Sequence, residues 1–373
     1  MALMQTRLGR SLLVLTLAAV VLAGCGRPPE IIGLDNPTVP VADVPGIKRH
    51  NIFVISTRQA SSAPGAFLSA DRSPELGLAS LTVTIPPTHV VGQVERPRRP
   101  PPDPRTDFTV VEPALYATDT AFVAAINREL ARRPAGQRRL LIFAHGYNNT
   151  ATDGLLRLAQ FVEDSGFDGV PVLFTWASAA RTPRYVYDLN SALIARGKIK
   201  EVAAIGGATR AESVDILAHS MGTLLIMEGL VDLQQAGTLG ARGTINHIML
   251  ASPDIDIDLF RTQLHELPRS IRERIFVLIS RDDRALRASS LLAGGVPRVG
   301  MADAGELEGL GLTVVDLSEI DNSSAGSHAK FAGSPEVVQL IGAALTTVSS
   351  LDAGHPPGLR DLLTAAPIRI FGN

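Results

Sequence analysis

A serine flanked by small residues is the clearest candidate for chemistry in this chain. Ser220 lies in Ala218-His219-Ser220-Met221-Gly222, after an apolar run and before a stretch of helical spacing. A serine on a tight turn from a strand into a helix can act as a nucleophile, and such a turn demands small neighbours. Gly222 meets this demand, and Ala218 adds one methyl group where glycine is usual. An ordinary tight turn would share the motif, but the strand and helix around it favour a nucleophile. We expect the His219 side chain to point away from the pocket, because Ser220 occupies the tip of the turn.

A serine nucleophile needs two partners, and the chain supplies candidates for both. A histidine must remove the hydroxyl proton and a carboxylate must orient that histidine, in the chain order serine, acid, histidine. We predict His328 as the base, because it follows the last strand-like run by a short loop. The predicted acid is Asp283, with Asp254 and then Asp282 as alternatives, since all three follow strand-like runs. The other histidines after the serine are less well placed: His247, His265 and His355.

A second loop is predicted to stabilise the negative charge that develops during acyl transfer. Residues 140–144 form an apolar run leading into His145-Gly146-Tyr147, where a second oxyanion-hole amide is expected. We predict the Tyr147 and Met221 amides as donors, which are worth roughly 3–4 kcal/mol each in related chemistry. His145 and Gly146 are expected to shape this loop. No further metal-spaced ligand lies near His145, so we expect neither a metal nor a cofactor.

These residues must be positioned by a sheet. Six apolar runs of strand length alternate with stretches of helical periodicity, so the strands are expected to be buried on both faces. The pattern predicts an α/β fold, with a mostly parallel sheet covered by helices on both faces and an N-terminal β extension. Reactive groups gather at the carboxyl ends of such strands. The predicted strands are 51–56, 81–85, 140–144, 170–176, 214–218, 245–251, 275–280 and 312–317, and the predicted helices are 119–133, 151–165, 191–209, 222–235 and 335–348.

The amino terminus is similar to a bacterial secretion signal. Two arginines precede an apolar run over 12–21, which is too short for a comfortable membrane span. Leu22-Ala23-Gly24-Cys25 follows and resembles the lipobox of bacterial lipoproteins, in which the cysteine becomes the lipidated first residue. The resemblance implies a lipid anchor on Cys25 and a place in the cell envelope. Gly26 rather than Asp after this cysteine favours the outer membrane, facing the periplasm.

The chain divides into five predicted segments. We expect a signal peptide over 1–24, a lipidated cysteine and Pro/Gly-rich tether over 25–45, and a β extension over 46–110. The hydrolytic core is predicted over 111–350, followed by a tail over 351–373. With 45% apolar and 19% charged residues the composition is that of a globular protein, and a net charge of −2 offers nothing to nucleic acid. We therefore expect no nucleic-acid partner. The sequence carries no signal for an oligomeric state.

From residue 51 to about residue 348 the chain resembles a bacterial family of functionally uncharacterised α/β hydrolases. The resemblance implies an α/β-hydrolase fold with Ser220, Asp283 and His328 as a triad. It favours Asp283 over Asp254, because Asp-Arg-Ala-Leu follows a core strand in such hydrolases. As alternatives to a role as the acid, Asp254 would cap the helix that starts near Leu259 or support the site by hydrogen bonding, and Trp176 is a further candidate for site support. The chain departs from the family at Ala177, where proline is usual. The motifs that carry the resemblance are Ser56-Thr57-Arg58, Val83-Thr84-Ile85-Pro86 with His89, His145-Gly146-Tyr147-Asn148, Phe174-Thr175-Trp176, Tyr187-Asp188, Ala218-His219-Ser220-Met221-Gly222, Pro253-Asp254-Ile255-Asp256, Asp283-Arg284-Ala285-Leu286 and Ser327-His328.

The expected function is hydrolysis of an ester, thioester or amide of a small acyl substrate through an acyl-enzyme. An acyltransferase would use the same triad, and an inactive envelope-anchored binding protein could share the scaffold. The loop over 177–188 is expected to border the pocket. Its arginines, Arg181 and Arg184, would favour an anionic substrate, although a solvated loop packed by Tyr185 and Tyr187 explains them equally well. No long apolar insertion indicates a lipase lid, which favours small or soluble esters.

Overall fold

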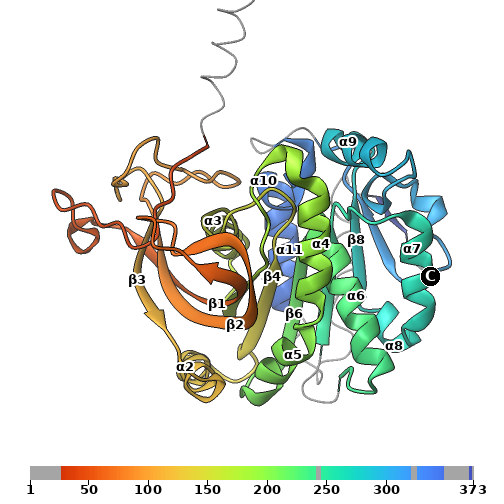
Figure 1. The fold of residues 1–373 in the computed structure, drawn as a ribbon, viewed down its shortest axis with the longest axis horizontal. Helices are drawn as coiled ribbons and strands as arrows, with labels where there is room; N and C mark the ends of the chain where they lie inside the picture. Colours follow the sequence, from red (N-terminus) through yellow and green to blue (C-terminus); the bar gives the residue numbers. More distant parts are fainter. Residues whose placement is uncertain (1–26, 241–244, 321–325, 348–368, 372–373) are drawn as a thin grey trace, which may run out of the picture.

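The computed structural model describes residues 27–240, 245–320, 326–347 and 369–371. These residues form a ten-stranded sheet with the order β10-β9-β8-β7-β6-β4-β5-β1-β2-β3 (Figure 1). The seven strands from β9 to β1 run parallel to one another. At the edges the pairing is antiparallel: β2 pairs with β1, β3 with β2, and β10 with β9. The predicted α/β fold, with a mostly parallel sheet and an N-terminal β extension, is confirmed.

Each of the six apolar runs becomes a parallel strand, and each predicted end lies within one residue of the observed end. These strands are covered on both faces, and every residue of β5 and of β8 is buried. A strand buried on both faces must be apolar throughout, which is why continuous runs identified it. The strands are β1 Lys48–Ala60, β2 Leu68–Ile85, β3 Thr109–Leu115, β4 Arg139–Ala144, β5 Val170–Thr175, β6 Ser213–His219, β7 Ile245–Ala251, β8 Ile275–Ile279, β9 Thr313–Asp316 and β10 Arg369–Phe371.

Two hydrophobic cores flank the sheet. One lies under α2, α4, α5, α6 and α7, and the other lies under α3, α10 and α11. Figure 1 shows α4 and α6 in front of the parallel strands and α11 behind them. The α-helices are α2 Asp119–Ala131, α3 Ala151–Ser165, α4 Tyr185–Arg196, α5 Ile199–Ala208, α6 Met221–Gln235, α7 Ile257–Glu266, α8 Arg269–Arg272, α9 Arg284–Leu292, α10 Lys330–Gly333 and α11 Pro335–Thr347. Single 3-10 turns are η1 Val41–Asp43, η2 Thr182–Arg184, η3 Val299–Met301, η4 Ala304–Glu306 and η5 Ser327–Ala329.

Local signals explain where α3 begins and ends. Thr150 and Asp153 form a reciprocal capping box at its start, and Gly166 ends it in the left-handed conformation. The predicted helix over 191–209 is instead two helices, α4 and α5, separated by Gly197 and Lys198. Glycine weakens a helix by about 1 kcal/mol relative to alanine, so a chain that must turn can turn there.

The predicted tether does not hold for residues 27–45, which pack against the domain. Ile31 and Ile32 are buried, and the Ile32 amide donates to the carbonyl of Gly65 at 2.8 Å. The Gly33 amide donates to the carbonyl of Val110 at 2.7 Å. Burial of these apolar side chains stabilises the packed arrangement, and this could not be predicted from the proline and glycine content alone. The predicted signal peptide over 1–24 and the predicted lipidation site Cys25 lie outside the described residues.

Two further strands differ from expectation. Strand β3 spans the predicted boundary between residues 110 and 111 and is not among the predicted strands. It contains Pro113, which an edge strand tolerates because one side needs no donor. Strand β10 lies within the predicted tail, where Ile370 pairs with Val315 of β9. His355 and most of that tail lie outside the described residues. Among the helices described, none has the length and apolar character to cross a membrane.

Candidate active site

Ser220 occupies a strained turn between β6 and α6. Its backbone has φ 54° and ψ −125°, a region that a serine rarely adopts. The strain is held by hydrogen bonds from both sides: the Ser220 amide donates to the Ala251 carbonyl at 2.9 Å, and the Ser220 carbonyl accepts from the Thr223 amide at 2.9 Å. The side chain is 4% exposed. Ser220 thus lies at the carboxyl end of β6, in the turn from this strand into α6.

Two positions near Ser220 require glycine because the serine turn and the loop after β4 are in direct contact. A Cβ on Gly222 would lie 2.5 Å from the His145 carbonyl oxygen and 2.6 Å from that of Ala144. A Cβ on Gly146 would lie 2.8 Å from the Ser220 Cβ. Any side chain at either position would therefore push the serine turn away from the loop that follows β4.

His145 is a structural residue of that loop. It is buried; its Nδ1 donates to the Gly146 carbonyl at 2.9 Å, which leaves Nε2 to accept from the Thr175 hydroxyl at 3.0 Å. Burial, together with the charge of Arg58, lowers the pKa of His145 to about 3. The ring stacks on Trp176 with centroids 5.1 Å apart, and the indole N–H donates to the His145 carbonyl at 2.8 Å. His145 therefore stays neutral and orients the loop.

Arg58, on β1, also holds the loop that follows β4, a role that the sequence did not reveal. This buried guanidinium donates to the Thr175 hydroxyl at 2.8 Å, to the Ser178 carbonyl at 3.0 Å and to the Asn149 carbonyl at 2.8 Å. Burial, only partly offset by the nearby carboxylates of which Asp188 contributes most, lowers its pKa to about 10. Arg58 therefore remains charged at neutral pH and ties the ends of β4 and β5 together. The motif Ser56-Thr57-Arg58 included this arginine, but it did not indicate what the side chain binds.

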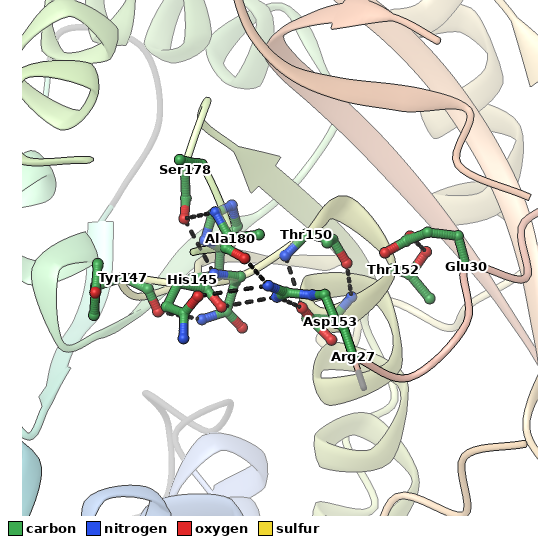
Figure 2. Close-up of polar contacts among 12 residues, drawn as sticks. Arg27, Glu30, His145, Tyr147, Thr150, Thr152, Asp153, Ser178 and Ala180 are labelled. Carbon is green, nitrogen blue, oxygen red and sulfur yellow. Dashed lines mark hydrogen bonds and ion pairs between the residues drawn. The ribbon is translucent and has the colours of Figure 1, made fainter. Parts of the chain in front are cut away.

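Asp188 anchors the far side of the loop from α4. Its carboxylate accepts from the Asn148 amide at 3.0 Å, from the Ala179 amide at 2.6 Å and from the Ser178 hydroxyl at 2.5 Å. Arg27 adds a third anchor, donating to the Asn148 carbonyl at 2.9 Å and to the Asp153 carboxylate at 2.7 Å (Figure 2). Loop residues 145–149 are thus held by three charged side chains from distant parts of the chain.

The two predicted oxyanion donors belong to segments next to the serine turn: Met221 follows Ser220, and Tyr147 follows Gly146, which lies against the Ser220 Cβ. Met221 opens α6, so its N–H is one of the amides that have no partner within the helix. Tyr147 follows Gly146 in the anchored loop; its hydroxyl donates to the Thr182 carbonyl and its ring packs against Tyr185, with centroids 5.3 Å apart. Fixed side chains leave the Tyr147 backbone little freedom to move.

Of the three candidate carboxylates, Asp283 is the one that contacts His328. The His328 Nδ1 lies 2.7 Å from the Asp283 Oδ2, and Asp283 is 0% exposed. The other carboxylate oxygen accepts from the Ala285 and Leu286 amides, both at 3.0 Å, which caps α9. Because a carboxylate accepts, Nδ1 carries the proton and Nε2 is left as the basic nitrogen.

Asp254 and Asp282 have other partners. Asp254 accepts from the Tyr185 hydroxyl at 3.0 Å and from the Ser289 hydroxyl at 2.5 Å, and its carboxylate lies 3.3 Å from the Arg298 guanidinium. Its amide also donates to the Ser220 carbonyl at 3.4 Å, so it braces the serine turn. Asp282 is paired with the Lys330 ammonium at 2.9 Å.

His219 does not point away from the site, contrary to expectation. Its Nε2 lies 2.9 Å from the His328 carbonyl oxygen, and the two rings are 4.6 Å apart. Its Nδ1 would lie 3.1 Å from a Cβ on Gly146. Burial, and to a smaller extent the neighbouring His328 ring, lowers the pKa of His219 well below its usual range. A neutral His219 therefore connects the serine turn to the loop that carries His328.

The described residues enclose a polar cavity near the site and an apolar cavity away from it. A polar cavity of about 950 Å³ lies beside the anchored loop and is lined in part by Asn148 and Asn149. An apolar cavity of about 300 Å³ lies under α5 and α6 and contains none of the predicted site residues. Across the described ranges, no group of three or more His, Cys, Asp or Glu side chains is arranged to hold a metal ion.

A family model described as an alpha/beta hydrolase of unknown function (DUF900) matches residues 118–344. Among solved structures, this chain resembles a fungal esterase from Rhizomucor miehei, with 12% identity over 86% of each chain and a TM-score of 0.36. It also resembles a thermostable esterase from Pseudomonas putida, with 15% identity over 84% of this chain and 88% of that chain and a TM-score of 0.35. Lipase B of Aspergillus fumigatus is 14% identical over 67% of this chain and 66% of its own, with a TM-score of 0.33. No curated protein matches in sequence. Structural similarity at this level of identity and TM-score does not indicate the function of this chain.

Proposed function

Because the chain belongs to the alpha/beta hydrolases of unknown function (DUF900), we propose that it is a serine hydrolase that cleaves an ester, thioester or amide through an acyl-enzyme. One observation carries the proposal: the buried Asp283 carboxylate is hydrogen-bonded to Nδ1 of His328, the histidine whose loop adjoins the strained Ser220 turn. A carboxylate, a histidine and a serine on a strained turn are the parts of an acyl-transfer site.

The proposed mechanism assigns one role to each residue. The Ser220 Oγ attacks the carbonyl carbon while the His328 Nε2 takes its proton, and His328 then gives that proton to the departing alcohol, thiol or amine. Asp283 holds the imidazole in the required tautomer and stabilises the imidazolium. Water, activated by His328, releases the acyl group and restores Ser220.

The oxyanion is proposed to bind the amides of Met221 and Tyr147. Met221 contributes the positive end of α6, and Tyr147 is oriented by the loop that Arg58 and Asp188 anchor. Donors fixed before the reaction cost no reorganisation when charge develops, so this anchoring serves catalysis directly.

Covalent labelling tests the proposal. A fluorophosphonate probe reacts with a serine that an adjacent base activates, so the purified full-length chain is expected to be labelled and Ser220→Ala is expected to lose labelling and ester hydrolysis. Ser62→Ala, an exposed serine of the turn after β1, serves as the matched control and should label like the parent chain. Undiminished labelling of Ser220→Ala would refute the assignment.

Two alternatives use the same scaffold. An acyltransferase would pass the acyl group to an alcohol, and product analysis with added alcohol acceptors separates it from a hydrolase. An inactive binding protein predicts no labelling at all. The intact contact between His328 and Asp283 supports an enzyme.

We further propose that Cys25 is lipidated and anchors the protein in the bacterial envelope, at the outer membrane facing the periplasm. Arg27 contacts the loop at Asn148 and stands two residues after Cys25. A lipid on Cys25 would therefore hold the site close to the bilayer rather than on a long tether. Metabolic incorporation of an alkyne fatty acid, lost in Cys25→Ser, is the test.

A further inference from the structure

The polar cavity beside the loop of Tyr147 is strongly basic. Four arginines and one aspartate are among the residues that line its volume of about 950 Å³: Arg27, Arg96, Arg157, Arg181 and Asp153. Figure 2 shows Arg27 in contact with Asp153 and with the chain at Ala180, and all three residues line this cavity. Such an excess of positive charge next to a reactive loop attracts an anion.

Two of the four arginines already have a carboxylate partner. Arg27 donates to Asp153 at 2.7 Å, and Arg96 forms an ion pair with the other oxygen of the same carboxylate. The one carboxylate of the lining is therefore shared between these two. Arg157 and Arg181 supply the positive charge that the lining itself does not balance.

Arg157 is the better placed of these two residues. It projects from α3, and its hydrogen bond is to the Gln160 amide oxygen at 2.7 Å rather than to a carboxylate. Burial lowers its pKa to about 10, partly offset by the more distant Asp164 and Asp153, so it remains charged at neutral pH. A partly buried guanidinium without a bonded carboxylate is a site where an anion gains a charge-assisted hydrogen bond.

The charge of Arg157 also reaches the serine turn. It is one of the charges that lower the pKa of His219, the residue immediately before Ser220. Asn148, which also lines the cavity, follows Tyr147, whose amide is a proposed oxyanion donor. The basic cavity therefore adjoins the loop that carries Tyr147, although Ser220 and His328 are not among the residues that line it.

We infer that this hydrolase acts on esters that carry an anionic group, a carboxylate or a phosphate, which Arg157 and Arg181 bind in the cavity beside the oxyanion loop. This inference rests on the proposed function, because it names the substrate class of the same site. The anion binds away from the scissile bond and orients the ester, while Ser220 and His328 perform the chemistry described above.

Matched esters test the inference on the full-length protein. Mono-p-nitrophenyl glutarate and p-nitrophenyl pentanoate share a leaving group and acyl length and differ in one carboxylate on the acyl side. 4-Acetoxybenzoate and its methyl ester differ in charge on the leaving-group side. We expect kcat/KM to favour the anionic member of at least one pair by tenfold or more, since one charge-assisted hydrogen bond is worth about ten- to hundredfold.

Variants connect that preference to the cavity. Arg157→Gln and Arg181→Gln should each reduce the ratio of anionic to neutral kcat/KM by roughly tenfold, and the exposed loop position of Arg181 keeps the test valid if Arg157→Gln fails to fold. Arg128→Gln, an exposed arginine of α2, is the matched control and should leave the ratio unchanged.

The outcomes separate the two proposals. A parent chain that is labelled by fluorophosphonate at Ser220 but hydrolyses both members of each pair equally overturns the anionic-ester inference alone. A preference that survives in both arginine variants also overturns it. Absence of both labelling and ester hydrolysis overturns the serine-hydrolase proposal and the inference with it.

Discussion

Replacing Gly146 by alanine should separate the oxyanion loop from the nucleophile without unfolding the protein. The added Cβ would lie 2.8 Å from the Ser220 Cβ, 3.1 Å from the His219 Nδ1 and 3.2 Å from the His219 carbonyl oxygen. Carbon atoms in contact lie about 3.5–4.0 Å apart, so the loop and the turn must part by roughly 0.7 Å or more. Gly146 does not have a positive φ, so the cost is steric rather than conformational.

The displacement sets the expected magnitudes. Overpacking of this kind costs about 1–3 kcal/mol, against a stability of about 5–15 kcal/mol for a typical domain, so Gly146→Ala should fold. A misplacement near 1 Å in an active site costs on the order of 100-fold, and the loss of one oxyanion donor costs about 100- to 1,000-fold. We therefore expect kcat to fall roughly 100-fold, which is about 2.7 kcal/mol of transition-state stabilisation.

Two measurements check this prediction. Urea unfolding reports the stability, and p-nitrophenyl ester turnover reports kcat. Gly206→Ala is the control: this glycine lies inside α5, and an added Cβ meets nothing within 4 Å. It should stabilise the protein by about 0.5–1 kcal/mol and leave kcat unchanged. A Gly146→Ala enzyme with parental kcat would refute the contact between the loop and the nucleophile.

Two further predictions concern carboxylates and pH. Asp283→Asn should lower kcat by about 10⁴-fold, because the histidine loses its orienting partner, whereas Asp254→Asn should cost far less; the reverse ranking in ester turnover would contradict the assignment. Burial lowers the pKa of His89, but its hydrogen bonds to Asp164 and Glu95 outweigh burial and raise the pKa overall. The stabilisation from His89 is therefore complete below about pH 6.5 and is lost as pH rises through the raised pKa. The difference in unfolding free energy between the parent and His89→Gln should shrink accordingly, and a difference that grows with pH would contradict the ion pairs.

Features encoded by neighbouring residues were accessible from the sequence. Each of the six central strands follows from a continuous apolar run, because a strand covered on both faces has no solvent-facing position. The start and end of α3 follow from Thr150 and Gly166, which cap it locally. The Ser220 turn follows from small residues between a strand and a helix.

Features that depend on contacts between distant residues could not be predicted from the sequence. Residues 27–45 and strand β3 carry proline and weak periodicity, and they are ordered by the surfaces against which they pack. Asp283 and Asp254 both follow strands of the same sheet and looked alike as acids, although a family resemblance favoured the first. The contact with His328, 45 residues beyond Asp283, distinguishes them in space.

The candidate site also contains both kinds of residue: those that could be chosen from the sequence and those that only the tertiary structure identifies. The order of serine, acid and histidine along the chain was sufficient to choose Ser220 and His328, because each follows a recognisable strand end. The side chains that hold the oxyanion loop could not be chosen in this way. Arg58 reaches Asn149 from 91 residues away, and Asp188 reaches Asn148 from 40 residues away. Buried charges of this kind are stable only where several partners converge on them, and it is the packing of the sheet that brings those partners together.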